Sequence, residues 1–383
     1  MDKRENKEKS AAAAACSATD RLRIVLTTVL FCGFLLIFFI WGLAEPDKSV
    51  SASERRPLEQ FPELSLDTVM SGSFMSDFED YSVDQFPIRD SFRTLKAVTG
   101  YYVLNQMDNN GVYLVDGQAS KLEYPINDES LDYFAKRLQY IYDTYLSGKG
   151  TSNYLCIIPD KNEFIAAENG YPVIDFDEFE SKVLAGSDYL EYIDIHDLLS
   201  ADDYYGTDIH WRQENLADVA AAIAAGMGAP YNGEFETVTV DVPFYGVYYG
   251  QSALPLKADP LRYLTNASIE AATVYDFETN SEIPVYSMEN ANGRDPYEMF
   301  LGGSKSLLVI ENPDALSDKE LVIFRDSFGS SLTPLLIESY SKITVVDIRY
   351  MMSNILGNFI EFDDQDVLFM YSMPVINNSN TMK

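Results

Sequence analysis

Residues 321–331 read Leu-Val-Ile-Phe-Arg-Asp-Ser-Phe-Gly-Ser-Ser, an apolar run that ends in polar and small residues. The apolar part predicts a buried strand, and the small residues after Asp326 and Ser327 predict the start of a helix. A serine in this place sits at the carboxyl end of a strand, where open α/β sheets bind their ligands. The amides of the helix N-terminus could stabilise an oxyanion there.

Strand and helix patterns alternate on both sides of this stretch. Strands are expected at 111–117, 154–159, 192–195, 320–324, 343–347 and 367–371, and helices within 57–100 and at 128–147, 214–227, 330–340 and 351–361. Strands that alternate with helices predict an α/β fold with a mostly parallel sheet and helices on both faces. Residues 230–300 are rich in Tyr, Thr, Val, Pro and Asn, and predict a strand-rich insertion in this domain.

A second motif, Tyr205-Gly-Thr-Asp-Ile-His-Trp211, lies before the predicted helix at 214–227 and contains one of only two histidines. In a turn, the spacing of Asp208 and His210 lets the carboxylate accept the imidazole Nδ1 proton, which leaves Nε2 as a base. Each motif alone has an ordinary explanation, a surface turn for one and a helix N-cap for the other. Together they supply a nucleophile, a base and an orienting carboxylate.

Residues 24–43, IVLTTVLFCGFLLIFFIWGL, carry no charge. At 1.5 Å per residue they span about 30 Å, the thickness of a bilayer core. Basic residues precede this run, and the acidic Glu45 and Asp47 follow it. The positive-inside rule therefore predicts a cytoplasmic tail at 1–23, a transmembrane signal anchor at 24–43, a linker at 44–56 and an extracytoplasmic domain at 57–383. The alternative is a cleaved signal peptide, because Gly42-Leu43-Ala44 resembles a cleavage site, although the run is long for one.

Composition limits the classes of partner. The 383 residues are 46% hydrophobic and 13% aromatic, which is typical of a globular protein. A formal net charge of −32 would repel phosphate backbones, so no nucleic-acid partner is expected. Of the three cysteines, only Cys156 lies beyond the apolar run, and there is no CxxC or Cys/His cluster. We therefore expect no internal disulfide, no metal site and no cofactor.

The two motifs resemble those of the DHHW family and of the SGNH-hydrolase-like alginate O-acetylation proteins. The similarity extends to residues 56–62, 71–74, 79–81, 84–89, 159–161 and 347–350, and covers about residues 55–375. In these proteins the Asp and His precede the Ser. The resemblance implies Ser327 as nucleophile, His210 as base and Asp208 as its orienting group. Ile209 replaces the first histidine of the family name, but the alginate relatives also lack a histidine there, so the triad is judged intact.

The resemblance implies a membrane-anchored acyl-transfer protein that O-acetylates a cell-surface or extracellular polysaccharide. Acetyl-CoA is not available outside the cell, so a membrane acyltransferase partner would have to deliver the acyl group. A carbohydrate esterase or deacetylase is an alternative, because the same triad hydrolyses an ester when water replaces the sugar. Another alternative is a non-catalytic surface binding or assembly protein that retains the fold.

Substrate contacts are expected from Arg349, Tyr350 and Trp211. The alternative for Arg349 is an internal salt bridge, and for Trp211 it is packing behind the triad. Oxyanion donors are harder to place from the sequence. The amide of Ser327 and the loops at Gly246 and Gly302-Gly303 are the candidates.

Overall fold

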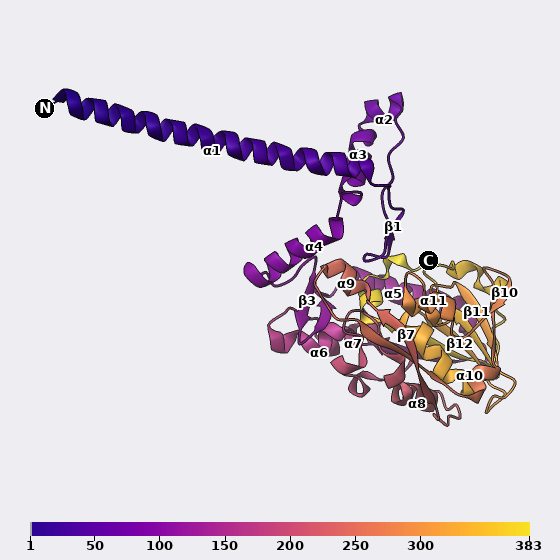
Figure 1. Ribbon diagram of the computed structural model, residues 1–383. Helices are drawn as coiled ribbons and strands as arrows, with labels where there is room; N and C mark the ends of the chain where they lie inside the picture. The colour runs from indigo at the N-terminus through magenta and orange to yellow at the C-terminus, as the bar shows by residue number, and fades with distance from the viewer. Residues whose placement is uncertain (1) are drawn as a thin grey trace. The chain divides into compact units, whose positions relative to one another are not determined.

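The computed structural model of the protein describes residues 2–383, with side chains from residue 19, in two compact units (Figure 1). The N-terminal unit comprises residues 1–96 and the sheet unit residues 97–383. The N-terminal unit begins with the long helix α1 (Asp2–Ala44). Within α1, Thr19–Ala44 is apolar and long enough to cross a membrane, as a membrane anchor or a signal sequence would be.

After α1, a short strand pair and three helices complete the N-terminal unit. Strands β1 (Val50–Ser51) and β2 (Arg56–Pro57) pair within a segment that we expected to be mostly linker. The predicted helical character of residues 57–100 is confirmed by α2 (Leu66–Ser71), α3 (Ser73–Asp84) and α4 (Arg89–Val98).

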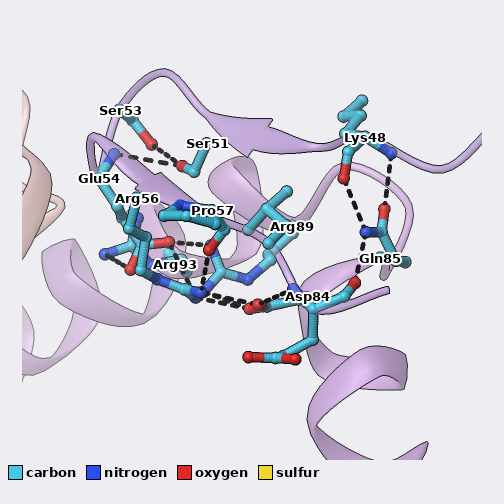
Figure 2. Close-up of polar contacts among 12 residues, drawn as sticks. Lys48, Ser51, Ser53, Glu54, Arg56, Pro57, Asp84, Gln85, Arg89 and Arg93 are labelled. Carbon is cyan, nitrogen blue, oxygen red and sulfur yellow. Dashed lines mark hydrogen bonds and ion pairs between the residues drawn. The ribbon is translucent and has the colours of Figure 1, made fainter. Parts of the chain in front are cut away.

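Charged side chains tie the strand pair to the helices (Figure 2). Arg56 forms a bidentate pair with Asp84 at 2.7 and 2.6 Å, and this pairing holds the pKa of the Asp84 carboxyl below its usual value. Arg89 pairs with Glu54, and Arg93 lies 3.3 Å from the same carboxylate. The start of α4 is therefore fixed to the segment that leaves α1.

The sheet unit is organised around eight strands in the order β10-β9-β11-β13-β12-β14-β5-β6. The bounds are β5 (Ser152–Ile158), β6 (Glu191–Tyr192), β9 (Thr273–Asp276), β10 (Ser281–Ile283), β11 (Leu307–Glu311), β12 (Glu320–Arg325), β13 (Lys342–Val346) and β14 (Asp366–Ser372). The five strands from β13 to β6 are parallel, and β11, β9 and β10 extend one edge by antiparallel pairing.

Helices cover both faces of this sheet, which confirms the predicted α/β fold with a mostly parallel sheet. Alternate residues of the buried strands face opposite layers, so Cys156 and Ile158 pack on one side and Leu155 and Ile157 on the other. The first layer holds α8 (Ala217–Gly226), α12 (Phe328–Leu332) and the 3₁₀ segment Thr333–Ser339 that continues α12. The second holds α5 (Asp128–Ile141) and α7 (Phe176–Ala185).

The chain order reverses at β12. From β12 the chain passes through α12 to β13 on one side, and then through the 3₁₀ segment Ser353–Asn358 to β14 on the other side. The two connections pack on opposite faces, since Leu335 belongs to the first layer and Leu356 to the second. Open α/β sheets bind ligands in the crevice beyond such a switch point, and Ser327 lies there, directly after β12.

The remaining elements surround this framework. They are β3 (Val112–Val115), β4 (Gln118–Lys121), β7 (Glu236–Phe244), β8 (Asp259–Thr265), α6 (Lys161–Ile165), α9 (Val247–Ser252), α10 (Ala267–Ala271), α11 (Met288–Ala291) and α13 (Met373–Asn377). Residues 230–300 are strand-rich as predicted. Only the β7–β8 ribbon is separate, however, because β9 and β10 join the main sheet.

Three predicted elements differ from the structure. The helix expected at 330–340 is mostly 3₁₀, because Pro334 has no amide hydrogen to donate to the preceding turn. The helix expected at 351–361 is a short 3₁₀ segment, Ser353–Asn358. The strand expected at 192–195 pairs with β5 only at Glu191–Tyr192.

The core between β12 and β14 makes a testable prediction. The rings of Phe324 and Phe369 stack at 4.7 Å, and both side chains are fully buried. Truncation by Phe369→Ala should lower the free energy of unfolding by about 3–5 kcal/mol, since it leaves a cavity in a close-packed layer. Urea unfolding followed by circular dichroism measures this change. Phe359→Ala, at an exposed position, is the control; an equal loss in both variants would contradict the prediction.

Candidate active site

Ser327, His210 and Asp208 form a continuous chain of hydrogen bonds. His210 Nε2 lies 2.8 Å from Ser327 Oγ, and His210 Nδ1 lies 2.5 Å from Asp208 Oδ1. With a proton on Nδ1 held by the carboxylate, Nε2 is free to take the hydroxyl proton of Ser327. The structure thus brings together the three side chains that the sequence places in two distant motifs.

The Asp208 carboxylate is buried, and backbone amides hold it in place. The amide of His210 donates to Oδ1 at 3.1 Å, and the amide of Val247, the first residue of α9, donates to Oδ2 at 2.7 Å. Gly246 packs so closely on the loop that an added Cβ would lie 2.3 Å from the Cβ of Asp208. These contacts fix the carboxylate beneath the imidazole and compensate for its burial.

Gly246 was one of the candidates for an oxyanion donor. Its amide instead donates to Thr207 Oγ1 at 2.8 Å, so Gly246 holds the Asp208 loop. At the second candidate loop, the Gly303 amide donates to the carbonyl of Phe300. Within residues 19–383, the amide hydrogen of Ser327 has no acceptor. Of the amides of Gly246, Gly303 and Ser327, that of Ser327 is therefore the one that can serve a ligand, and a role for Gly302 stays a prediction.

Two buried charged groups hold the rest of the loop from Tyr205 to His210. Asp259, the first residue of β8, accepts hydrogen bonds from the amides of Gly206 and Thr207, both at 2.8 Å. Lys161, which follows β5, donates its Nζ hydrogens to the carbonyls of Tyr205 and Asp208, also at 2.8 Å. Burial of Lys161 lowers the pKa of its ammonium group to about 8, because the charged form is desolvated.

Aromatic rings fix the orientation of the imidazole. The ring of Tyr297 stacks on His210 with centroids 3.8 Å apart and planes 12° apart, and the ring of Phe328 lies at 4.9 Å. The hydroxyl groups of Tyr297 and Ser331 lie 2.8 Å apart, which anchors the tyrosine to α12. The imidazole is thus confined by ring contacts in addition to its hydrogen bond to Asp208.

Trp211 does not occupy the place of a substrate-binding residue, so that prediction is wrong. Its side chain is fully buried, and its indole Nε1 donates to Ser331 Oγ at 2.8 Å. Its ring packs edge-on against Phe328 at 5.4 Å. Trp211 therefore supports α12 from behind the triad and has no surface to offer a ligand.

Arg349 follows β13 and forms a bidentate pair with Asp347, at 3.0 and 2.7 Å. The same residue lines a cavity of about 400 Å³ together with Ile209, which lies between the two triad residues of its loop. Tyr350 is half exposed beside Arg349. The internal salt bridge weighed for Arg349 is present, and a substrate contact by either residue stays a prediction.

The turn that carries Ser327 is tied to the neighbouring strand. Asp326 is fully buried and accepts hydrogen bonds from the amide and hydroxyl of Ser372, at 2.8 and 2.6 Å. Its other carboxylate oxygen accepts from the amide of Phe328 at 3.0 Å. Asp326 therefore joins the carboxyl ends of β12 and β14, and it fixes the backbone on both sides of Ser327.

Among the side chains of residues 19–383, no three His, Cys, Asp or Glu gather in a way that could hold a metal ion. What the site offers is a hydroxyl, an imidazole and a carboxylate joined by hydrogen bonds. This arrangement can deprotonate the hydroxyl and so activate it as a nucleophile.

Comparison with solved structures supports the fold assignment. A DHHW family protein from Eubacterium siraeum is 22% identical, with a TM-score of 0.57, over 72% of this chain and 94% of that one. Bacillus cereus PatB1, solved with a sulfonyl adduct, is 17% identical, with a TM-score of 0.53, over 71% of this chain and 96% of that one. The predicted resemblance to the DHHW family and the SGNH-like fold is confirmed. No protein-family model and no curated protein matches the chain.

The sequence analysis missed Lys161, Asp259 and Tyr297. Lys161 carried a signal, because a lysine directly after an apolar strand marks the carboxyl edge of the sheet, and Pro159-Asp160-Lys161 is part of the resemblance. Asp259 and Tyr297 carried none. They lie in a segment without clear periodicity, and they reach the triad only through the folding of residues 230–300.

Stability at alkaline pH tests the burial of Lys161. The pKa of a lysine is about 10.4 in an unfolded chain and about 8 for Lys161 in the folded protein. Between these values the unfolded chain binds more protons, so Lys161 makes the free energy of unfolding rise with pH. Lys161→Met should lose this rise between pH 8 and 10 in urea titrations.

The matched control is Lys136→Met, at an exposed position of α5, which should retain the pH dependence of the wild type. A constant difference between wild type and Lys161→Met across this pH range would contradict the prediction.

Proposed function

We propose that this protein is a Ser-His-Asp acyl-transfer enzyme that carries an acyl group on Ser327. The observation that carries the proposal is the chain of hydrogen bonds from Ser327 Oγ through His210 to the buried Asp208. The position of Ser327 at the switch point of the sheet supports it, because ligands bind there in open α/β folds.

In the first half of the reaction, Ser327 Oγ attacks the carbonyl carbon of an acyl donor while His210 Nε2 takes its proton. Asp208 stabilises the imidazolium that forms, through the hydrogen bond to Nδ1. The amide of Ser327 donates to the oxyanion of the tetrahedral intermediate. His210 then gives its proton to the leaving group, and the acyl group remains on Ser327.

In the second half, His210 takes a proton from an acceptor hydroxyl, whose oxygen attacks the acyl ester. The collapse of this intermediate returns the proton to Ser327 Oγ and completes the transfer. We propose that the acceptor is a hydroxyl of a cell-surface or extracellular polysaccharide. The resemblance to alginate O-acetylation proteins supports this choice; if water were the acceptor, the same groups would make a carbohydrate esterase.

We further propose that α1 holds the enzyme in the cell membrane, with residues 1–23 in the cytoplasm and the sheet unit outside. The apolar length of α1 and the charges that flank it support this orientation. A membrane acyltransferase would then supply the acyl group, because an extracytoplasmic site has no access to acetyl-CoA. Arg349, which lines the cavity with Ile209, would contact the substrate there, and the exposed Tyr350 beside it would add a second contact.

Covalent labelling tests the nucleophile. PatB1 was solved with a sulfonyl adduct, and a sulfonyl fluoride should likewise modify Ser327 of this protein. Mass spectrometry of the full chain after incubation should place one sulfonyl group on the peptide that contains Ser327. Ser327→Ala should abolish the label, and His210→Gln should slow labelling by about 10²-fold or more, as loss of a general base does.

Ser330→Ala is the matched control. Its hydroxyl is buried on the same helix and has no hydrogen-bond partner in the described part of the chain, so labelling should persist. A label on another residue, or one unchanged in Ser327→Ala, would refute the proposed nucleophile. Release of acetate without transfer to any sugar acceptor would favour the esterase.

Tyr297 provides a test of positioning. Tyr297→Phe keeps the ring that stacks on His210 and loses only the contact with Ser331, so kcat for a small acetyl ester should fall by no more than about threefold. Tyr297→Leu removes the stack and lets the imidazole rotate, which should lower kcat by about 10–10²-fold with little change in KM. Equal loss in the two variants, or a loss confined to KM, would exclude this role.

A further inference from the structure

The N-terminal unit exposes an apolar surface beside α1. Ile88 lies in the turn before α4, and Phe92 and Leu95 lie three residues apart, which places these two on one face of the helix. The exposed fractions of these three residues are 44%, 36% and 60%, and the neighbouring Phe86 is 38% exposed. Four large apolar side chains on one short segment form a surface that water solvates poorly. We call these four residues the α4 apolar face.

This face is continuous with α1. The ring of Phe86 stacks on that of Phe38 at 5.2 Å, and the ring of Phe92 lies 5.6 Å from the same Phe38. Gly42 contacts Pro87, whose ring would lie 3.7 Å from an added Cβ. The segment before α4 therefore packs on α1 at residues that belong to its apolar run.

The depth of these contacts follows from helix geometry. Phe38 lies five residues before Leu43, the end of the uncharged run, which is about 7.5 Å along the helix axis. Where α1 crosses a bilayer, Phe38 is therefore surrounded by acyl chains. Rings in contact with Phe38 lie within a few ångströms of its depth. The parts of Phe86 and Phe92 that do not touch α1 must then face lipid.

The polar side of α4 fits this placement. Arg89 and Arg93 lie away from the apolar face and pair with Glu54, and Arg89 also lies 3.3 Å from Asp84 (Figure 2). A helix with Phe and Leu on one side and Arg on the other is typical of helices that lie in the membrane interface. These ion pairs hold the two guanidinium groups beside the carboxylates of Glu54 and Asp84.

We propose that the α4 apolar face is a membrane-contact surface, which inserts between lipid acyl chains in the leaflet at the carboxyl end of α1. Its partner is the lipid that surrounds α1, because the two surfaces are continuous through Phe38. The inference depends on α1 being retained as an anchor. It is independent of the proposed acyl transfer. Its consequence is that the N-terminal unit is held at the bilayer by more than one helix.

Quenching by brominated lipid tests this contact directly. The full chain, with Trp41→Phe to lower the background, is reconstituted into phosphatidylcholine vesicles whose acyl chains carry bromine. Quenching by bromine reports contact with acyl chains and is not produced by contact with protein. Leu95→Trp should lose about half of its added fluorescence relative to vesicles without bromine, as expected for a side chain buried about 5–10 Å into the interface.

Asp90→Trp is the matched control, because Asp90 lies on the opposite side of the same helix and is exposed. Its added fluorescence should change by less than about a tenth in brominated vesicles, since its side chain faces away from the acyl chains. Phe92→Trp provides a second probe of the face in case Leu95→Trp does not fold. Circular dichroism reports folding of each variant.

Strong quenching at positions 95 and 92 with little at position 90 supports the proposal. Weak quenching at positions 95 and 92 in folded protein would overturn it and would leave the face free for a protein partner. Equal quenching at positions 95 and 90 would also overturn it, because no single face would then contact lipid. The lipid contact is measured by quenching alone. Sulfonyl labelling of Ser327 tests only the acyl-transfer proposal, so failure of one proposal is distinguishable from failure of the other.

Discussion

The hydrogen bonds that hold the loop from Tyr205 to His210 are the constraint on which the candidate site depends. Lys161 reaches the loop from the end of β5, Asp259 from the start of β8, and Val247 from the start of α9. Each bond satisfies a polar group that folding removes from water, and in such a setting an unpaired group would be costly. The position of the base is therefore set by three segments that lie far apart in the sequence.

The nucleophile depends on a different part of the fold. Ser327 takes its place from the parallel sheet, whose strand β12 ends at the switch point, and from Asp326, which fastens that end to β14. The imidazole takes its place partly from residues 230–300, which supply Val247, Asp259 and Tyr297. The hydrogen bond between His210 and Ser327 thus joins the sheet to the segment inserted in it. That segment is part of the site.

Much of the fold could be predicted from the sequence, because β5, β12, β13 and β14 are short apolar runs bounded by polar residues and turns. Their bounds lie within about two residues of those expected. The 3₁₀ segments could not be predicted in the same way, since apolar periodicity does not distinguish a 3₁₀ from an α-helix. The pair β1–β2 was missed because each strand has only two residues and reads as linker.

The residues of the candidate site also differ in how well the sequence predicts them. Asp208, His210 and Ser327 could be chosen because their side chains carry unusual chemistry in short motifs. Trp211 was misplaced because a tryptophan beside a catalytic motif can serve either packing or binding, and only its burial decides. Asp259 and Tyr297 act through tertiary contacts, and nothing in their local sequence marks them. The composition and spacing of short motifs therefore identify the reacting residues more readily than the residues that position them.

Ile209 shows what the hydrogen-bonded chain requires of its motif. The isoleucine is partly buried against core residues and lines the cavity, while the imidazole that contacts Ser327 belongs to the following residue. The position of the first histidine in the DHHW motif, occupied here by Ile209, contributes no atom to these hydrogen bonds. Proteins with the same arrangement can therefore differ at the position of Ile209 and still present the same serine hydroxyl, imidazole and carboxylate. A classification by the distances among serine, imidazole and carboxylate would group such proteins. A classification by the residues of the sequence motif would separate them.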